Sequence, residues 1–416
     1  MSVDDHIHAP RPGTGAEGPV PRAQRALAPD LARGAVLLLI ALANCAGAFF
    51  LAAPGIEPAP QGLERVLNVF MFVFVHARGY PMFAFLLGYG LVQLARRRDA
   101  AAGGSGAGRA ALLRRSAWLL VFGLAHGLLL NSGDILGAYG IVGIVFALLL
   151  LGRRERVHRI ILWIWGLQAA YVLAFTAWAW WTVAASSDVP AVMPIREIAT
   201  GWPSMEASTY AASVAARLSE WPTHTLYISG VILVVWLGAW AARRRILEDP
   251  AAHRRLLLWT ATAGIGIGVA GGLPMGLFSA GWLHADVAAA GTIKLLYEAS
   301  GQFGGIGYVA LFGLIALALS KRHAAGRPGV VVDALTALGQ RSLSGYLVQS
   351  AAWLVLVSPY ALALGGSSSG STAFTAAGCA VGVWLATVVA AYLMHRRSLR
   401  GPAEVLLRRL AYGRRG

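Results

Sequence analysis

Charged residues are scarce in this sequence. They make up 13% of the 416 residues, about half of the roughly 25% found in soluble domains. Hydrophobic residues make up 57%, and several apolar runs exceed the roughly 18 residues needed to cross a bilayer core. This composition excludes the two or three soluble domains that the length alone would suggest. We expect an all-α, polytopic integral membrane protein without a sizeable soluble domain.

Cysteine is also scarce, and the familiar catalytic motifs are missing. Cys45 and Cys379 both lie inside apolar runs, so they give no disulfide framework and no metal-ligand spacing. We interpret them as buried, inert thiols. The sequence contains no Gly-Lys-Thr phosphate loop, no His-Glu-x-x-His and no Gly-x-Ser-x-Gly, so no motif assigns a reaction class and no metal site is predicted.

The apolar runs predict a bundle of about ten transmembrane helices. The ten ranges are 34–53, 79–95, 111–130, 134–152, 158–183, 223–242, 255–275, 301–320, 341–363 and 373–394. The amphipathic segment 63–75 predicts an additional helix on the bilayer surface, and the alternative is that 67–95 forms one long tilted span. The longest outer loop, 184–222, is interpreted as a small lid or a plain linker, and 276–300 as a second outer loop.

Three regions follow from this division. Residues 1–28 are rich in Pro, Gly and Ala and predict a disordered cytoplasmic tail. Residues 29–396 form the transmembrane bundle. Residues 397–416 form a basic cytoplasmic tail.

The basic residues predict the orientation of the bundle. The formal net charge is +16, but the sequence has no basic stripe with interleaved aromatic residues, so nucleic acid is not an expected partner. The expected partner is the lipid bilayer. All of the 35 basic residues fall on one side of the predicted topology except Arg65, Arg78, Arg196, Arg217 and Lys294. By the positive-inside rule, this asymmetry predicts that both termini are cytoplasmic.

Polar residues that enter the apolar runs are the candidate functional residues, because polar groups are costly in a membrane. On the outer side, a turn at 131–134 joins two predicted spans and brings His126 near Asp134. A histidine oriented by a carboxylate is a standard general base. Asp134 is also well placed to cap the following helix, and His126 could make a structural polar contact only. Both interpretations stay open.

His76 and Arg78 complete the outer group together with Asn131. His76 is the rival candidate for the catalytic base. Arg78 either binds an anionic group or extends to the lipid phosphates.

A second group lies toward the inner face. Asp30 and Arg33 are three residues apart and share a helix face, as an interfacial ion pair or as part of a ligand site. The ninth span adds polar residues to this face: Gln340, Arg341, Ser344, Tyr346 and Gln349. Asn44, near the middle of the first span, either bonds a neighbouring helix or acts directly in function.

Several segments, taken together, resemble a bacterial membrane protein family. They are Asp30-Leu-Ala-Arg-Gly34 followed by Asn44, Tyr80-Pro-Met-Phe-Ala-Phe-Leu-Leu-Gly-Tyr-Gly90, His126 with Gly133-Asp-Ile-Leu136 and Tyr139, Gly339-Gln-Arg-Ser-Leu-Ser-Gly-Tyr-Leu-Val-Gln-Ser350, and Gly401-Pro-Ala-Glu-Val-Leu-Leu-Arg-Arg409. This pattern is similar to the YeiB-like proteins, whose C-terminal half carries domain-of-unknown-function family 418, here 223–412. The sequence departs from the family in lacking the serine after the second aromatic residue of 83–85 and in having Gly345 in place of an asparagine.

The resemblance implies a relation to transmembrane acyltransferases. It implies transfer of an acyl group from a cytoplasmic thioester, with acyl-coenzyme A as the donor substrate, to an envelope glycan or small-molecule acceptor. Arg33 and Arg341 would then hold the donor phosphates, and His126, aided by Asp134, would deprotonate the acceptor. Tyr139, Tyr346 and Gln349 join them as substrate-binding candidates.

Two other functions fit the same residues. The chain could transport a small solute or lipid, although no broken helices at matching positions of two halves are predicted. It could also be a structural or accessory protein whose polar residues are caps and interhelical contacts. We predict no covalently bound cofactor and a bacterial inner-membrane location, and the sequence does not indicate the oligomeric state.

Overall fold

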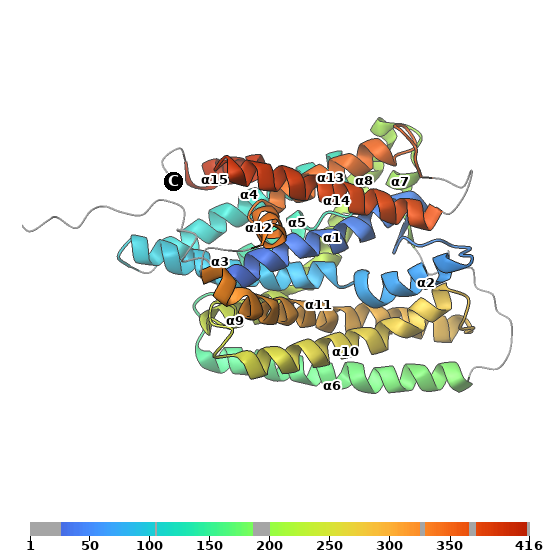
Figure 1. The fold of residues 1–416 in the computed structure, drawn as a ribbon, viewed down its shortest axis with the longest axis horizontal. Helices are drawn as coiled ribbons and strands as arrows, with labels where there is room; N and C mark the ends of the chain where they lie inside the picture. The colour runs from blue at the N-terminus through green and yellow to red at the C-terminus, as the bar shows by residue number, and fades with distance from the viewer. Residues whose placement is uncertain (1–25, 105, 186–199, 325–328, 366–371, 414–416) are drawn as a thin grey trace, which may run out of the picture.

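The computed structural model describes residues 26–104, 106–185, 200–324, 329–365 and 372–413. The described chain is a bundle of helices, with one antiparallel pair of two-residue strands. Figure 1 shows the long helices α6, α10 and α11 along one edge of the bundle, and α13, α14 and α15 along the opposite edge. The all-α fold predicted from composition is therefore confirmed. Most of the predicted tail at 1–28 lies outside the described residues.

The elements of the first half have the following bounds: α1 Leu27–Phe50, β1 Ala52–Ala53, α2 Leu63–Phe70, the π-helix η2 Met71–Val75, α3 Gly79–Ala101, α4 Ala107–Leu129, α5 Leu136–Val145, the π-helix η3 Phe146–Leu150 and α6 Glu155–Ala185. The second half contains β2 Thr200–Gly201, α7 Pro203–Glu206, α8 Tyr210–Ser229, α9 Ile232–Arg243, α10 Arg254–Ser279, α11 Val287–Ala324, α12 Val330–Gly339, α13 Ser342–Leu356, α14 Thr372–Arg396 and α15 Pro402–Tyr412.

Among the described residues, seven helices are long and apolar enough to cross a membrane, and eight if the bent pair α8–α9 counts as one span. Two further predicted spans, 134–152 and 341–363, are helical but shorter, at Leu136–Leu150 and Ser342–Leu356. At 1.5 Å per residue a helix of about 15 residues covers about 22 Å, less than the roughly 30 Å bilayer core. The ten predicted spans thus exist as helical segments, but two of them are too short to cross alone.

The predicted boundaries around the sixth span are wrong. The helix begins at Tyr210, inside the loop predicted at 184–222, and continues through Pro222. It then breaks after Ser229 and resumes at Ile232 with a bend of 47°. Polar residues interrupt the apolar pattern over the first turns of α8, where Ser213 and Arg217 are buried and Tyr210 and Leu218 are exposed, so hydrophobicity alone did not mark this part of the helix. Of the predicted loop, residues 186–199 lie outside the described residues.

The segment predicted as a separate surface helix, 63–75, is instead nearly continuous with α3. Residues Leu63–Ala101 form one candidate span, interrupted only around Ala77, whose φ is 59°. This agrees with the alternative of one long span. The apolar residues Leu63, Val66 and Phe70 are exposed, while the polar Glu64 and Asn68 are buried, as expected for a helix whose apolar face meets lipid.

Two predictions for the C-terminal half, the loop at 276–300 and the tail at 397–416, differ from the structure. Helix α11 begins at Val287, so the loop predicted at 276–300 is reduced to residues 280–286, and Lys294 and Glu298 lie on the helix. The region predicted as a basic tail, 397–416, contains α15. This helix packs against α4 and α13.

Basic residues gather at one end of the bundle, as the topology predicted. Arg96 at the end of α3 donates hydrogen bonds to the carbonyl oxygens of Ala242 and Arg243 at the end of α9. Arg244 pairs with Glu155 at the start of α6, with a distance of 2.7 Å. In Figure 1 the start of α1 and the whole of α15 lie toward this same end. Its assignment to the cytoplasm stays a prediction.

Glycine allows α10 and α11 to approach closely. A Cβ on Gly264 would lie 2.6 Å from the carbonyl oxygen of Phe303, and one on Gly268 would lie 3.0 Å from the Cα of Gly304. Gly264 and Gly268 are four residues apart and therefore lie on the same face of α10. Small residues are the usual way for helices to pack in lipid.

The first prediction concerns this packing. Replacing Gly264 with Val should force the two helices apart and lower the free energy of unfolding by about 1–3 kcal/mol. Gly266 is the matched control, because a Cβ there has no neighbour within 4 Å. Thermal unfolding of the purified protein in nanodiscs measures both. Equal melting temperatures for Gly264→Val and Gly266→Val would contradict the close approach.

Candidate functional site

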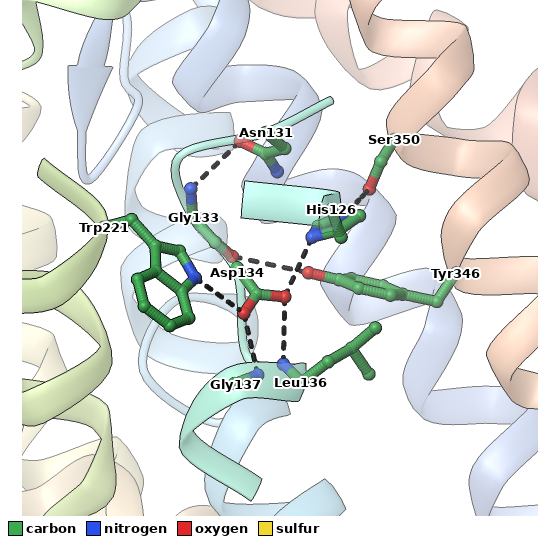
Figure 2. A network of polar contacts seen from close by, with 9 residues as sticks. All are labelled: His126, Asn131, Gly133, Asp134, Leu136, Gly137, Trp221, Tyr346 and Ser350. Carbon is green, nitrogen blue, oxygen red and sulfur yellow. Dashed lines mark hydrogen bonds and ion pairs between the residues drawn. The ribbon is translucent and has the colours of Figure 1, made fainter. Parts of the chain in front are cut away.

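Three buried side chains form a continuous hydrogen-bonded chain, Ser350–His126–Asp134, which we call the triad. The Nδ1 atom of His126 lies 2.8 Å from Asp134 Oδ1, and its Nε2 atom lies 2.8 Å from Ser350 Oγ. Their exposed fractions are 0% for Ser350, 2% for His126 and 0% for Asp134. Figure 2 shows the histidine ring between the carboxylate and the hydroxyl. The contact between His126 and Asp134 expected from the sequence is confirmed.

The carboxylate of Asp134 fixes the histidine tautomer. Because an ionised carboxylate only accepts hydrogen bonds, the His126 proton must be on Nδ1. The Nε2 atom then has a free lone pair, and the Ser350 hydroxyl donates to it. This is the arrangement in which a histidine can accept the proton of a serine nucleophile.

Three other donors hold the same carboxylate. The backbone N–H of Leu136 donates to Oδ1 at 3.0 Å, that of Gly137 donates to Oδ2 at 2.7 Å, and the indole Nε1 of Trp221 donates to Oδ2 at 3.2 Å. The first two bonds cap the N-terminus of α5, where a negative charge is favourable. Asp134 therefore caps α5 and also contacts His126. The contacts that the two interpretations of this residue require are both present.

The α4–α5 turn, residues 130–135, is shaped by its own polar and small residues. Asn131 Oδ1 accepts a hydrogen bond from the backbone of Gly133 at 3.1 Å, a local turn that asparagine favours. A Cβ on Gly123 would lie 2.0 Å from the backbone nitrogen of Gly137, so only glycine lets the two helices meet here. This close approach brings His126 on α4 within reach of the first turn of α5.

Helix α13 supplies the serine and also Tyr346. The Tyr346 ring lies 4.8 Å from the His126 ring, between centroids, and its hydroxyl donates to the carbonyl oxygen of Gly133 at 3.4 Å. The sequence placed Tyr346 in the inner group, and this is wrong. Tyr346 lies in the second turn of α13, where it contacts the α4–α5 turn and His126 rather than Asp30 and Arg33.

The C-terminal helix α15 positions α13. Glu404 Oε1 accepts hydrogen bonds from the backbone N–H groups of Leu343 and Ser344, and its Oε2 accepts one from the Ser344 hydroxyl. A carboxylate from α15 thus satisfies the free N–H groups at the start of α13. The orientation of Ser350 therefore depends on a residue about fifty positions further along the chain.

His76 and Arg78 lie at a separate place. His76 Nε2 lies 3.0 Å from the carbonyl oxygen of Gly55. Arg78 has an exposed fraction of 0% and donates to the carbonyl oxygens of His76 and Gly268, so the prediction that it extends to lipid phosphates is wrong. No hydrogen bond or ion pair in the described part of the chain joins either residue to the triad, so the predicted outer group is two groups.

The inner group is partly assembled. Arg33 and Asp30 form an ion pair at 3.1 Å, and Gln340 donates to the second oxygen of Asp30 at 3.2 Å. Arg341 instead donates to the carbonyl oxygens of Ala337 and Leu399. Three of the predicted inner residues are therefore joined, and Arg341 is anchored to the backbone around α12 and α15.

The remaining candidates have varied surroundings. Tyr139 is buried and donates to the carbonyl oxygen of Tyr80 at 2.8 Å, which ties α5 to α3. Gln349 has an exposed fraction of 1%, and both polar atoms of its amide have no hydrogen-bond partner. Asn44 lines a cavity beside the α4–α5 turn.

Sequence reasoning missed Ser350 and Trp221. The signal for Ser350 was its spacing, because Tyr346 and Ser350 are four residues apart and share one helix face. Nothing in the sequence pointed to Trp221, which reaches Asp134 only because α8 begins earlier than the apolar run indicated. Among the described residues, no group of three or more His, Cys, Asp or Glu side chains could hold a metal ion.

Comparison with known proteins finds a family similarity in the C-terminal part of the chain and assigns no activity. Residues 241–414 match the model of the family described as "Protein of unknown function (DUF418)". The chain is 26% identical to "Uncharacterized protein YxaH" of Bacillus subtilis over 82% of this chain and 80% of that protein. It is 34% identical to an "Uncharacterized 39.9 kDa protein in amylase 3'region" of Bacillus acidopullulyticus over 28% of this chain and 31% of that protein. No solved structure matches the chain.

The family model and the Bacillus subtilis relative confirm the resemblance to the YeiB-like, family-418 proteins. The matched range begins at residue 241, later than the expected 223. The names of the two relatives state no reaction. The relation to acyltransferases therefore stays an expectation.

The second prediction separates the two contacts of Asp134. Asp134→Ala removes both the helix cap and the partner of His126, and we expect it to lower the free energy of unfolding by about 1–3 kcal/mol, since buried donors lose their acceptor. Asp134→Asn keeps the cap and should recover about half of that loss. Thermal unfolding of the two variants in nanodiscs measures this difference. A wild-type melting temperature for Asp134→Ala would contradict the structural role.

Proposed function

We propose that this chain, whose residues 241–414 match the DUF418 family model, is a membrane acyltransferase in which Ser350 is the nucleophile, His126 the general base and Asp134 the residue that orients the base. The observation that carries the proposal is the buried chain of two 2.8 Å contacts joining the three side chains. A nucleophile within hydrogen-bond reach of a base, which a third group orients, is the recurring arrangement of covalent acyl transfer.

In the first half of the reaction, the Ser350 hydroxyl attacks the carbonyl carbon of a thioester donor. Its proton passes to Nε2 of His126, and the ionised Asp134 stabilises the resulting imidazolium. The tetrahedral intermediate then collapses, the carbon–sulfur bond breaks, and the leaving thiolate takes the proton from His126. The product of this half is an ester of Ser350 and a free thiol.

In the second half, a hydroxyl or amine of the acceptor attacks the Ser350 ester. His126 Nε2 takes the proton of the acceptor and returns it to Ser350 Oγ as the ester bond breaks. The acceptor leaves with the acyl group, and the triad is restored. Water is excluded by burial of all three side chains, which favours transfer over hydrolysis.

The donor enters from the basic end of the bundle in this proposal, and the class of donor is an acyl-coenzyme A. Arg33, whose side chain is 21% exposed and paired with Asp30, is the candidate contact for the donor phosphates. Arg341 has a positioning role there, because it is bound to backbone carbonyl groups beside α13. The location is the bacterial inner membrane, where a cytoplasmic thioester and an envelope acceptor meet on opposite faces.

Transport is the second candidate, and one observation favours it. The span formed by α8 and α9 is broken and bent by 47°, and discontinuous helices are common at transporter binding sites. Solute flux into proteoliposomes that continues without acyl donor, and that Ser350→Ala leaves unchanged, would favour this function over acyl transfer.

The third prediction tests the covalent step. Purified protein in nanodiscs, incubated with [14C]acetyl-coenzyme A, should become labelled on the chain, and hydroxylamine should release the label. We expect Ser350→Ala and His126→Ala to reduce the rate of labelling roughly 10³-fold or more, because each removes a partner of one catalytic unit.

Ser342→Ala is the matched control, since Ser342 is on the same helix and is not part of the triad. It should be labelled like the wild type. Labelling of Ser350→Ala at the wild-type rate would overturn the role of the serine. A wild-type chain that never becomes labelled, in a preparation that acetylates envelope lipid or glycan, would show direct transfer without an acyl-serine.

A further inference from the structure

A cavity lies beside the α4–α5 turn, and its polar lining is almost entirely uncharged. The space between its walls is about 430 Å³ when the open mouth is included. The polar residues that line it are Asn44, Asn131, Ser132, Ser204, Arg217 and Ser358. Five of these six present amide or hydroxyl groups, and Arg217 is the one charged residue of the lining.

Arg217 is a buried cation that has no carboxylate partner in the described part of the chain. Its exposed fraction is 5%, and no ion pair to it is found among the described residues. It donates to the carbonyl oxygen of Leu128 and to the hydroxyl of Tyr360, both at 3.3 Å, beyond the usual range for an N–H···O bond. Its Nε atom is buried and has no partner.

Glu220, which is bonded to the cavity residue Ser204, forms no ion pair with Arg217. Glu220 accepts from the backbone and hydroxyl of Ser204, at 2.9 and 2.5 Å, so both of its oxygens are already used. A buried guanidinium held only by two long bonds to neutral groups is costly. An anionic group bound in the cavity would remove this cost, and guanidinium prefers carboxylate or phosphate oxygens.

The cavity is built from the elements that carry the triad. Asn131 and Ser132 follow His126 in the α4–α5 turn, and Trp353, which also lines the cavity, is one helical turn beyond Ser350 on α13. Asn44 gives the cavity a wall from α1. The amides and hydroxyls of this lining can hydrogen-bond the hydroxyl groups of a ligand, while Arg217 binds its charge.

We propose that this cavity binds a small anionic polyol, a compound that carries a carboxylate or phosphate group next to hydroxyl groups. The role of this polyol as the acyl acceptor rests on the proposed function, because the triad would catalyse the transfer of the acyl group to it. Binding itself does not depend on the triad. The same chemistry occurs in soluble sugar or glycerol phosphates and in anionic lipid headgroups, so the test has one arm for each source.

The fourth prediction is a binding measurement. The soluble arm titrates sn-glycerol 3-phosphate, against uncharged glycerol, into the protein in phosphatidylcholine nanodiscs and follows intrinsic tryptophan fluorescence, because Trp353 lines the cavity. The lipid arm replaces a fraction of the phosphatidylcholine with phosphatidylglycerol. We expect saturable binding in one arm and at least a tenfold weaker affinity for Arg217→Gln.

Arg65→Gln is the control, since it removes the same charge from the same predicted side of the membrane without touching the cavity. It should bind like the wild type. Ser350→Ala should also bind like the wild type even though it transfers no acyl group, so a failure of the proposed function leaves this result intact. Asn44→Leu, which keeps Arg217, should weaken binding too.

Two outcomes would overturn the inference. One is wild-type protein that binds neither probe more tightly than its uncharged counterpart. The other is folded Arg217→Gln that binds the anionic probe with unchanged affinity. If Arg217→Gln does not fold, unchanged binding by Asn44→Leu has the same meaning.

Discussion

The carboxylate of Asp134 is the group on which the rest of the site depends. It is fully buried and accepts four hydrogen bonds, from His126, Trp221, Leu136 and Gly137. A charge in such a place is stable only when its donors are all present. The four donors come from α4, α5 and α8, so satisfying this one group fixes three helices relative to one another. The tautomer of His126 and the acceptor atom offered to Ser350 follow from it.

The sequence was informative where physical chemistry acts locally. Apolar runs predicted the helices, the short turn predicted that His126 meets Asp134, and the four-residue spacing of Gly264 and Gly268 is the pattern that lets α10 approach α11 closely. These features need only hydrophobicity, glycine and chain connectivity. The family resemblance, carried by motifs along the chain, was confirmed over the C-terminal part.

What the sequence could not give depends on long-range packing. Ser350 meets His126 across 224 positions, and no local pattern predicts that contact. Tyr346 was assigned to the inner face because α13 was expected to be a full-length span. The early start of α8 was not predicted because polar residues such as Arg217 lower the hydrophobicity of its first turns, and the break between α8 and α9 leaves no mark in the apolar pattern.

In the proposed reaction, the donor and the acceptor bind at different places in the bundle. Arg33, Asp30 and Gln340 gather toward the basic end, where a coenzyme A thioester would arrive. The cavity with Arg217 lies beside the α4–α5 turn, next to the triad, which joins Ser350 of α13 to His126 of α4 and Asp134 of the turn. Glu404 links α15 to the first turn of α13, so the C-terminal segment is part of the machinery that holds Ser350 in place.

The central claim is that His126 activates Ser350. Its most direct test is the reaction of the protein in nanodiscs with a small fluorophosphonate, followed by peptide mass spectrometry. The account predicts a phosphonyl group on Ser350, with labelling strongly reduced in His126→Ala and Asp134→Asn and unchanged in Ser342→Ala. Labelling of Ser350 that is equally fast without His126, or an unlabelled Ser350 in protein that transfers acyl groups, would contradict it.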